Sequence, residues 1–415
     1  MRVAVCGAGA FGRNHLRVYR ELESRESETA GQPVAPVVLV AAVEPDSARA
    51  AETASQYAIP VFPSVEALLA ADLRLHAASL AVPTVHHHAV AAPLLEAGLD
   101  LLVEKPLAAS LAEADHLLQI AEKHGRILQP GHLERFNPAV LAIQPKLRRP
   151  MFFEAHRLSI FTPRSLDVDV VLDLMIHDLD IVLTFANSPV REVRAVGLPI
   201  LSPKVDIANV RVEFESGCVA NFTASRVSTE RVRKLRFFEP RQYVSIDYAR
   251  QDLLVIRLDG EPGSAQPAGI APLLQKALAL GLDPGKLAAL AAALPPEVVA
   301  AVTAGKIDAH VTAQIAATGL IDPATLAKLG LAVAGPAPGG PAPGLSFVKP
   351  EVTPGEPLRL EIESFLQSVR TRRQPRVTAR QGREALALAL EIQDSMAAHA
   401  HRAGLDDFFT PESSS

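Results

Sequence analysis

The chain has 415 residues, of which 48% are hydrophobic and 21% are charged, a composition typical of a globular protein with more than one hydrophobic core. Its formal net charge is −5, so no strongly basic surface is available for nucleic acid or for an acidic membrane. The sequence starts MRVAVCG, which enters a strand directly, and no apolar segment reaches transmembrane length. Cys6 and Cys218 show no metal-ligand spacing. We therefore expect a cytoplasmic protein that has no metal site and binds neither nucleic acid nor membrane.

The first predicted strand, Val3–Cys6, is followed at once by a glycine-rich G-x-G-x-x-G sequence, and Arg13–Arg20 then has helical character. Between a strand and a helix, such a loop lets backbone N–H groups and the helix N-terminus hold a pyrophosphate. The pattern predicts a dinucleotide site. Its predicted residues in this loop are Gly7, Gly9, Ala10, Phe11 and Gly12.

Glu44 stands at the carboxyl end of the second predicted strand, Val37–Val43. A carboxylate at this place accepts hydrogen bonds from the adenosine ribose hydroxyls and repels a 2′-phosphate, so it predicts NAD rather than NADP. The gap from the glycines exceeds the usual ~20 residues, and the polar stretch Glu21–Pro36 explains it as an inserted loop. The alternative is a solvated carboxylate at a strand end.

Further apolar runs alternate with helical segments, which predicts a doubly wound α/β domain of the Rossmann type. The predicted strands are Ala58–Phe62, Ala77–Val82, Asp100–Val103 and Ile127–Gly131, and we place this domain at residues 1–131.

Lys105 follows one of these strands, in Glu104-Lys105-Pro106. Ligands of open α/β sheets bind beyond the carboxyl ends of the strands, so Lys105 is placed to reach a substrate. Pro106 restricts Lys105 to extended geometry, and the bond between them is of the only kind expected to be cis. A solvated strand-end lysine is the alternative. Further on, Arg135 is a candidate for holding a phosphate or carboxylate, unless it pairs with Glu134 or Glu154.

After Pro150, short alternating runs bounded by turn signals predict a largely antiparallel sheet, and two amphipathic helices, Leu358–Arg370 and Ala379–Ala400, follow much later. We place an α+β domain for substrate binding and oligomerisation at residues 132–259 and 345–402, and its exposed sheet face predicts a homo-oligomer. The predicted strands are Phe152–Leu158, Glu192–Pro199, Ala208–Phe214, Cys218–Ser225, Val232–Phe238, Tyr243–Tyr248 and Leu253–Leu258.

Val170–Ala186 lies between the first two of these strands and is predicted as a buried helix with one polar stripe. Asp173, His177, Asp180 and Thr184 are spaced i, i+4, i+7 and i+11, which places them on one face of an α-helix. Buried carboxylates need partners. The stripe therefore belongs either to a satisfied polar network or to the wall of a cleft.

Residues 260–344 are rich in Ala, Leu, Gly and Pro and contain no Trp, Tyr or Phe. No chemical motif is present in this stretch. We interpret it as a helical or mobile insertion, and residues 403–415 as a tail.

Three motifs in this order, GAGAFGRNH at 7–15, EKP at 104–106 and D-x-x-x-H at 173–177, resemble the Gfo/Idh/MocA family of sugar oxidoreductases. The resemblance covers residues 1–259 and 345–402. It implies a Rossmann domain followed by an α+β domain with an open-faced sheet, and NAD(H) or NADP(H) held by Gly7, Gly9 and Gly12 of the glycine-rich loop. It also implies that Lys105, Asp173 and His177 act on the hydroxyl that is oxidised. The resemblance adds further residues to the predicted cofactor site, namely Pro83, His87, Glu104 and Lys105.

The chemistry of these side chains fits alcohol oxidation. His177 has an ordinary pKa near 6.5, suited to accepting the hydroxyl proton, and Asp173 can fix its tautomer. Lys105 stabilises the developing alkoxide if it is charged, or is itself the base if burial lowers its pKa. The sequence does not decide between Lys105 and His177.

A finer resemblance points to the UDP-N-acetylglucosamine 3-dehydrogenase subgroup of lipid A precursor biosynthesis. The matching segments are GHLERFNP at 131–138, DLMIHDLDIVL at 173–183, KVDIANVRVEFESGCVANFTASRVS at 204–228 and PLRLEIESFL at 357–366. This implies oxidation of a sugar-nucleotide substrate at C3, followed by an aminotransferase, and the insertion at 260–344 departs from the pattern. The alternatives are another sugar, inositol or nucleotide sugar, or a regulator that senses NAD without turnover. Candidates to neutralise a diphosphate are Arg135, Arg164, Lys204 and Arg226.

Overall fold

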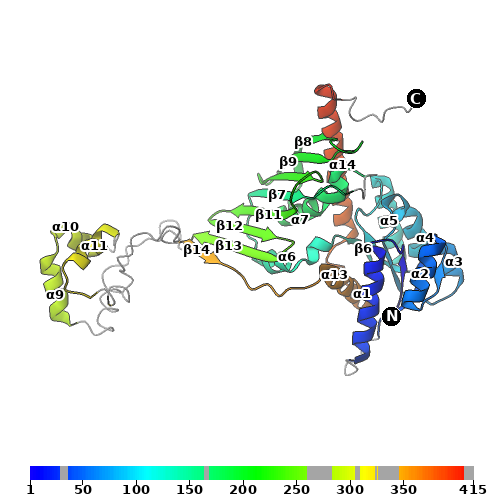
Figure 1. Ribbon diagram of the computed structural model, residues 1–415, viewed down its shortest axis with the longest axis horizontal. Helices are drawn as coiled ribbons and strands as arrows, with labels where there is room; N and C mark the ends of the chain where they lie inside the picture. Colours follow the sequence, from blue (N-terminus) through cyan, green and yellow to red (C-terminus); the bar gives the residue numbers. More distant parts are fainter. Residues whose placement is uncertain are drawn as a thin grey trace. The chain divides into compact units, whose positions relative to one another are not determined.

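The computed structural model describes residues 1–28, 36–162, 168–258, 283–303, 309–322, 325 and 345–405. It divides into two compact units, the first formed by Met1–Val255 with Lys349–Ser415 and the second by Ile256–Val348 (Figure 1). None of the described helices is long and apolar enough to cross a membrane.

The N-terminal sheet has six strands in the order β3-β2-β1-β4-β5-β6, with every neighbouring pair parallel. Its central strands are apolar on both faces because helices cover both sides. The order reverses between β1 and β4, and ligands of such sheets bind at this switch point. The strands are β1 (Arg2–Cys6), β2 (Val38–Val43), β3 (Val61–Phe62), β4 (Ala77–Leu80), β5 (Asp100–Glu104) and β6 (Leu128–Gly131).

Each face of this sheet is covered by its own group of helices. One face packs against α3 (Val65–Ala70), α4 (His87–Glu96) and α5 (Leu111–His124). The other packs against α1 (Gly12–Glu28) and α2 (Ser47–Tyr57). Side chains of Asp46, Ser64 and Ser110 accept backbone hydrogen bonds at the starts of α2, α3 and α5, as N-cap residues do.

Helix α13 (Pro357–Thr371) also belongs to the core of the N-terminal sheet. Leu358, Ile362 and Phe365 are buried there beside Leu16 and Tyr19 of α1. Figure 1 shows α13 next to α1, although about 330 residues separate them along the chain. A segment close to the end of the chain therefore completes the first core.

The second sheet has eight strands in the order β14-β13-β12-β11-β7-β10-β9-β8. The pair β7–β10 is parallel, whereas β8–β9, β9–β10, β7–β11 and β11–β12 are antiparallel. The sheet is therefore mixed and mostly antiparallel, which confirms the predicted fold class. Its strands are β7 (Phe152–Leu158), β8 (Val190–Leu198), β9 (Ile207–Phe214), β10 (Val219–Ser225), β11 (Val232–Glu239), β12 (Gln242–Asp247), β13 (Asp252–Leu258) and β14 (Leu345–Val348).

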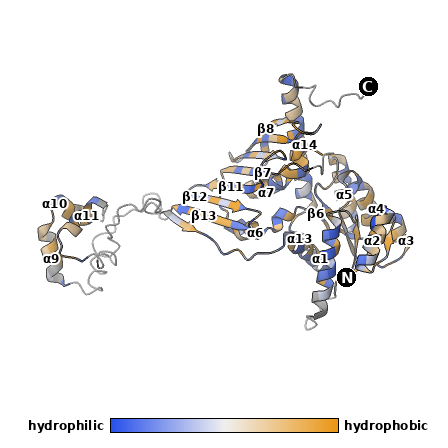
Figure 2. Cartoon of the chain, in the orientation of Figure 1, coloured by the Kyte–Doolittle hydropathy of each residue, from blue (hydrophilic) through white to orange (hydrophobic). Residues whose placement is uncertain are grey.

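One face of the second sheet packs against α6 (Pro138–Ile143), α7 (Ile176–Ala186) and α14 (Ala379–Arg402). Buried and more exposed residues alternate along β7 and β9, so the other face stays open. Figure 2 shows hydrophobic residues along β12 and β13, whereas α1 is mostly hydrophilic. Short 3-10 helices complete the unit: η1 (Thr84–His86), η2 (Leu133–Phe136) and η3 (Gln144–Lys146).

The predicted helix Val170–Ala186 is present, but the expectation of regular α-helical spacing is wrong for its first part. Val171–Met175 form a π-helical turn, labelled η4, and α7 begins only at Ile176. The Asp169 carboxylate accepts the backbone N–H groups of Val171 and Leu172 and a side-chain hydrogen bond from Gln393 of α14. A wider turn rotates Asp173 relative to His177, so the 3.6-residue period does not relate them.

The second unit has helices of its own and a small core. Its described helices are α9 (Pro284–Ala293), α10 (Pro296–Thr303) and α11 (Ala309–Ala317). Val298, Val311, Ile315 and Ile321 are buried together in this core. The stretch Ile270–Leu280, which has helical character in the sequence, lies outside the described residues.

Candidate functional site

The glycine-rich loop leaves room where a pyrophosphate binds in Rossmann domains. A Cβ added at Gly9 would meet nothing within 4 Å, whereas one at Gly12 would collide with the Gly7 carbonyl oxygen. Gly7 has φ +93°, and a Cβ there would lie 2.7 Å from the Ala81 carbonyl oxygen. Gly7 and Gly12 therefore allow the tight loop, and Gly9 faces open space at the N-terminus of α1. These features fit a dinucleotide.

Glu44 is not a solvated strand end, because only 4% of it is exposed. Its Oε2 accepts the Ala8 N–H at 2.9 Å, and its Oε1 accepts hydrogen bonds from the Asp46 N–H and the Arg49 guanidinium, both at 3.0 Å. Burial alone would raise the pKa of Glu44, but these hydrogen bonds, led by that from Arg49, outweigh it and lower the pKa. Glu44 is thus an anion attached to the glycine-rich loop.

Glu104 and His87 support the neighbouring loops. Glu104 Oε1 lies 2.9 Å from His15 Nε2 of α1, and both side chains are nearly inaccessible. His87 is 1% exposed, and its two ring nitrogens lie 2.8 Å from the Pro106 carbonyl oxygen and 3.0 Å from that of Val82. Pro83, which is exposed, directly follows Val82. The loops after β1, β4 and β5 are thereby connected. Sequence reasoning gave His15 no role, although its place three residues after Gly12 was a usable signal.

Lys105 reaches from the end of β5 to the π-helical turn. Its Nζ donates to the Asp173 carbonyl oxygen at 2.6 Å and to that of Leu172 at 3.4 Å, while the Asp173 carboxylate lies 3.8 Å away. The Lys105–Pro106 peptide bond is cis. Side-chain exposure is 18% for Lys105 and 28% for Asp173, so a small molecule can approach both.

Both candidate bases have lowered pKa values. Burial is the main cause for Lys105, and the Asp173 carboxylate opposes it. Burial also lowers the pKa of His177 well below its usual 6.5, and the charges of Lys105 and Arg157 add to the effect. His177 is therefore neutral at neutral pH. Its Nδ1 makes no hydrogen bond within the described part of the chain, so Asp173 does not fix its tautomer there.

The polar stripe splits into two parts. Asp173 and His177 lie near Lys105, whereas Asp180 and Thr184 bind Arg135, which is 2% exposed. Arg135 Nη1 lies 3.3 Å from Asp180 Oδ1, so Arg135 pairs with neither of the glutamates considered from the sequence. The half with Asp180 and Thr184 belongs to a buried network, whereas Asp173 in the other half stays partly exposed beside Lys105.

A second buried network lies beside His177 and was not expected. Arg157 of β7 binds Asp178 through Nε at 2.7 Å and Nη2 at 3.0 Å, and binds Glu134 through Nη1 at 3.1 Å. The Arg157 guanidinium also lies over the Tyr248 ring, 5.2 Å from its centroid. The Arg157–Asp178 ion pair joins β7 to α7 and so holds the helix on the sheet. Because Asp178 follows His177 directly, the ion pair also fixes the backbone next to His177. The sequence signal was Asp178 itself, a carboxylate on the apolar side of the helix.

The other candidates for neutralising a diphosphate differ from one another in their exposure to solvent. Arg226 is 4% exposed and its Nε lies 2.7 Å from Asp206 Oδ1, whereas Lys204 is exposed. Arg164 lies outside the described residues.

Glu361 of α13 is a buried acid close to this site. It is 0% exposed, and neither carboxylate oxygen has a hydrogen-bond partner within the described residues. Burial raises its pKa well above 4.5, and the charges of Glu104 and Asp180 raise it further. Glu361 therefore holds its proton more tightly than an exposed glutamate does.

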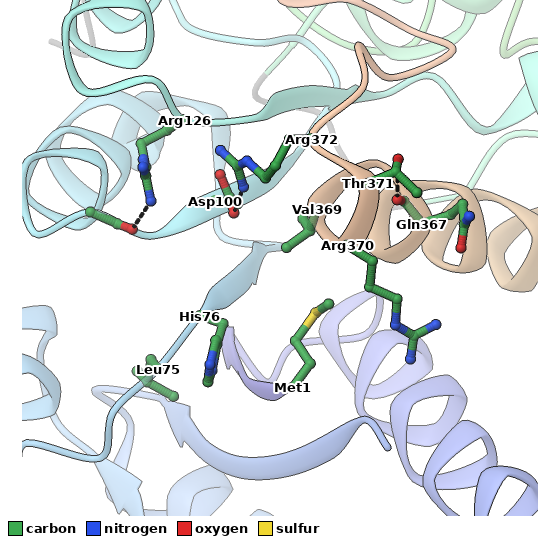
Figure 3. A pocket seen from close by; sticks show the side chains of 11 residues that line it. Met1, Leu75, His76, Asp100, Arg126, Gln367, Val369, Arg370, Thr371 and Arg372 are labelled. Carbon is green, nitrogen blue, oxygen red and sulfur yellow. Dashed lines mark hydrogen bonds and ion pairs between the residues drawn. The ribbon is translucent and has the colours of Figure 1, made fainter. Parts of the chain in front are cut away.

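A cavity of about 640 Å³ lies at the amino-terminal ends of the strands of the N-terminal sheet (Figure 3). Met1, His76 and Asp100 line it, close to the starts of β1, β4 and β5. Arg372 Nη1 donates a hydrogen bond to Asp100 Oδ2 at 2.6 Å, and Figure 3 shows the two side chains next to each other. Because Lys105 and the glycine-rich loop follow the other ends of these strands, this cavity is not the candidate site.

Two family models match the chain. One, described as "Oxidoreductase family, NAD-binding Rossmann fold", matches residues 1–132, and the other, "GFO/IDH/MocA C-terminal domain", matches residues 140–241. The chain is 38% identical over 254 residues to the UDP-N-acetylglucosamine 3-dehydrogenase of Acidithiobacillus ferrooxidans, covering 61% of this chain and 76% of that protein. It is 28% identical over 221 residues to an inositol 2-dehydrogenase of Corynebacterium glutamicum, covering 49% of this chain and 58% of that one.

The solved structures agree on the fold. The structure of GnnA, the UDP-N-acetylglucosamine 3-dehydrogenase of A. ferrooxidans, matches with TM-score 0.70 and 28% identity, covering 96% of this chain and 98% of that one. Levoglucosan dehydrogenase in complex with NADH matches with TM-score 0.67 and 16% identity, covering 96% and 97%, which shows a common fold.

Proposed function

The chain belongs to the Gfo/Idh/MocA oxidoreductase family, and on this premise we propose that it oxidises UDP-N-acetylglucosamine at C3 to the 3-keto sugar nucleotide. Its relatives are sugar and inositol dehydrogenases that act on CH–OH groups, and the chain is an NAD-dependent oxidoreductase of this kind. The specific substrate is supported by one observation above others. The UDP-N-acetylglucosamine 3-dehydrogenase of A. ferrooxidans is 38% identical over 254 residues, and its solved structure aligns with 96% of this chain.

The cofactor is proposed to lie on the glycine-rich loop. Gly7, Gly9, Ala10, Phe11 and Gly12 would hold its pyrophosphate, and Glu44 its adenosine ribose. Pro83, His87 and Glu104 would shape the nicotinamide end through the connected loops after β4 and β5. When bound, NAD supplies the ring that accepts the hydride.

Lys105 is the proposed base. A general base works best when its pKa lies near the working pH, and burial moves that of Lys105 down from 10.5 in this direction. His177 is a weaker base, because its pKa is already well below 6.5. We assign His177 to a hydrogen bond that orients the hydroxyl. Asp173 positions Lys105 through its main-chain carbonyl. Arg135 is too buried to meet a substrate directly, and we expect it to act through Asp180.

Purified protein with NAD and UDP-N-acetylglucosamine tests the proposal. Alcohol oxidation by NAD is unfavourable at neutral pH, so a pyridoxal-phosphate aminotransferase with glutamate is added to consume the ketone. We expect NADH formation and a 3-amino sugar nucleotide, with myo-inositol as the matched alternative substrate. NADH from inositol or another sugar, together with none from UDP-N-acetylglucosamine, would overturn the substrate while leaving the dehydrogenase class intact.

The same proposal implies two partners. An aminotransferase would consume the ketone, and the open face of the second sheet would bind a second copy of the chain. Light scattering on the purified protein measures the second expectation, and a monomer at micromolar concentration would contradict it.

A further inference from the structure

Arginines stand at the same end of three neighbouring strands of the second sheet. Arg157 of β7 is directly opposite Arg233 of β11 in the antiparallel register. On the other side of β7, Ala224 of β10 is the partner of Arg157, and Arg226 follows two residues later. The row therefore reads Arg226, Arg157, Arg233 across β10, β7 and β11.

Two members of this row are neutralised and the third is not. Arg226 is paired with Asp206, and Arg157 with Asp178 and Glu134. Arg233 is exposed and forms no ion pair or side-chain hydrogen bond within residues 1–28, 36–162, 168–258 and the other described segments. Its carbonyl oxygen accepts the Tyr248 N–H at 3.0 Å, so its backbone is fixed.

The side chain of Arg233 leaves the strand toward α7. Leu235 and Phe237, two and four positions later, are buried in the core under α7. Residues two apart in a strand project from the same face. Arg233 is thus at the rim of the face that α7 covers, on the side that holds His177.

Several positive charges act on His177. Burial is the main cause of its lowered pKa, and the further causes include the charges of Lys105, Arg157 and Arg233. Although the side chain of Arg233 is exposed, the loss of part of its hydration and the nearby charge of Arg157 both lower its pKa. A bound anion would relieve this repulsion, whereas a neutral polyol would not.

We propose that Arg233 binds the anionic phosphate group of the substrate and thereby selects phosphorylated sugars. Under the proposed function, on which this inference rests, the group is the diphosphate of the nucleotide sugar, attached close to the ring carbon that is oxidised. A guanidinium suits this task because its fork of N–H donors binds two phosphate oxygens at once. Inositol lacks such a group and is therefore a poor substrate.

The test measures binding of UDP, which cannot be oxidised, to the NAD-loaded protein by isothermal titration calorimetry. Charged hydrogen bonds to phosphate are strong, so Arg233→Gln should weaken UDP binding by about tenfold or more. Arg233→Lys should lie between this variant and the wild type. Arg380→Gln removes the same charge from an exposed surface of α14, and its UDP affinity should equal that of the wild type. Unchanged NAD affinity shows that each variant is folded.

The outcomes separate the two proposals. UDP affinity within twofold of the wild type in Arg233→Gln, or no UDP binding by the wild type, overturns the role of Arg233. Arg233-dependent UDP binding without NADH from UDP-N-acetylglucosamine supports Arg233 and rejects the proposed sugar. Oxidation of UDP-N-acetylglucosamine with a raised KM and a nearly unchanged kcat in Arg233→Gln supports both.

Discussion

The Lys105 ammonium is 2.6 Å from the main-chain carbonyl oxygen of Asp173 and 3.8 Å from the carboxylate of the same residue. Its nearest acceptor is therefore a neutral dipole. A close carboxylate would favour the charged ammonium strongly, but a carbonyl favours it less, and burial then lowers the pKa of Lys105. When Lys105 loses its proton, the group at hydrogen-bonding distance is a neutral carbonyl. No carboxylate at that distance loses its positively charged partner.

Lys105→Met should lower kcat/KM by about 10²–10⁴-fold, the usual contribution of a general acid–base group. Lys105→Arg keeps the positive charge but cannot lose a proton, so it should lose almost as much. In the wild type, kcat/KM should rise with pH as Lys105 deprotonates, with a midpoint below 10.5. The pH profiles of the three proteins check this, and an active Lys105→Arg variant would show that only the charge matters.

His177→Asn should be much milder than Lys105→Met. Asn keeps a hydrogen-bonding group. Because the pKa of His177 is well below 6.5, His177 does not change its charge near neutral pH, so the variant loses no titrating group there. We expect the pH dependence of kcat/KM to keep its wild-type shape between pH 6 and pH 9. If steady-state kinetics show that His177→Asn no longer has the pH-dependent rise in kcat/KM, then His177 and not Lys105 is the base.

Glu44→Gln should reduce the preference for NAD over NADP by about an order of magnitude, because a 2′-phosphate brings about two further negative charges to this carboxylate. Gln keeps an acceptor for the Ala8 N–H and releases Arg49 from its ion pair. The measurement is kcat/KM for each cofactor. Glu52→Gln, at an exposed position of α2, is the matched control. An unchanged ratio in Glu44→Gln would remove Glu44 from the cofactor site.

The free energy of unfolding of Glu361→Gln should exceed that of the wild type by an amount that grows as the pH rises. Because the folded state raises the pKa of Glu361, it keeps a proton that the unfolded chain loses above pH 4.5, and this lowers the free energy of unfolding with rising pH. The slope for one proton is about 1.4 kcal/mol per pH unit. Urea unfolding at pH 5 to pH 8 should show the difference between variant and wild type growing, with exposed Glu391→Gln as control. A constant difference would mean that Glu361 is ionised in the folded protein.

Deletion of residues 260–344, replaced by a short Gly/Ser bridge, should leave a folded protein that binds NAD. The described part of this segment buries Val298, Val311 and Ile315 among its own residues, and the proposed cofactor residues all belong to the other unit. Circular dichroism and an NAD titration measure the result. Insoluble protein, or the loss of NAD binding, would show that the segment is part of the main fold.

Most of the strands were predictable because period-2 alternation and short apolar runs are local signals, but β14 was not predicted. The predicted strand Phe152–Leu158 has the bounds of β7, and β9 starts only one residue before its predicted start. The Rossmann loop was also local, since strand, glycines and helix follow one another directly. Sheet order and partner choice are not local, and nothing in the sequence of either strand signalled the parallel pairing of β7 with β10.

The parts that sequence reasoning missed depend on distant residues. The π-helical turn is fixed by Asp169, which in turn accepts a hydrogen bond from Gln393 of α14. Arg157 meets Asp178 only because β7 lies under α7. The apolar stripe of α13 predicted burial but could not say against which sheet. Hydrophobic periodicity indicates that a face is covered, and tertiary packing decides what covers it.

The position of α13 has a consequence for biosynthesis. Domains usually fold in the order in which the ribosome delivers them. Here the N-terminal sheet, β1 to β6, is complete after residue 131, but the helix that covers Leu16 and Tyr19 is made only at residues 357–371. A nascent chain therefore keeps this apolar surface exposed while the second sheet and the whole 260–344 segment are being translated. During that interval the exposed surface of α1 is a binding site for chaperones.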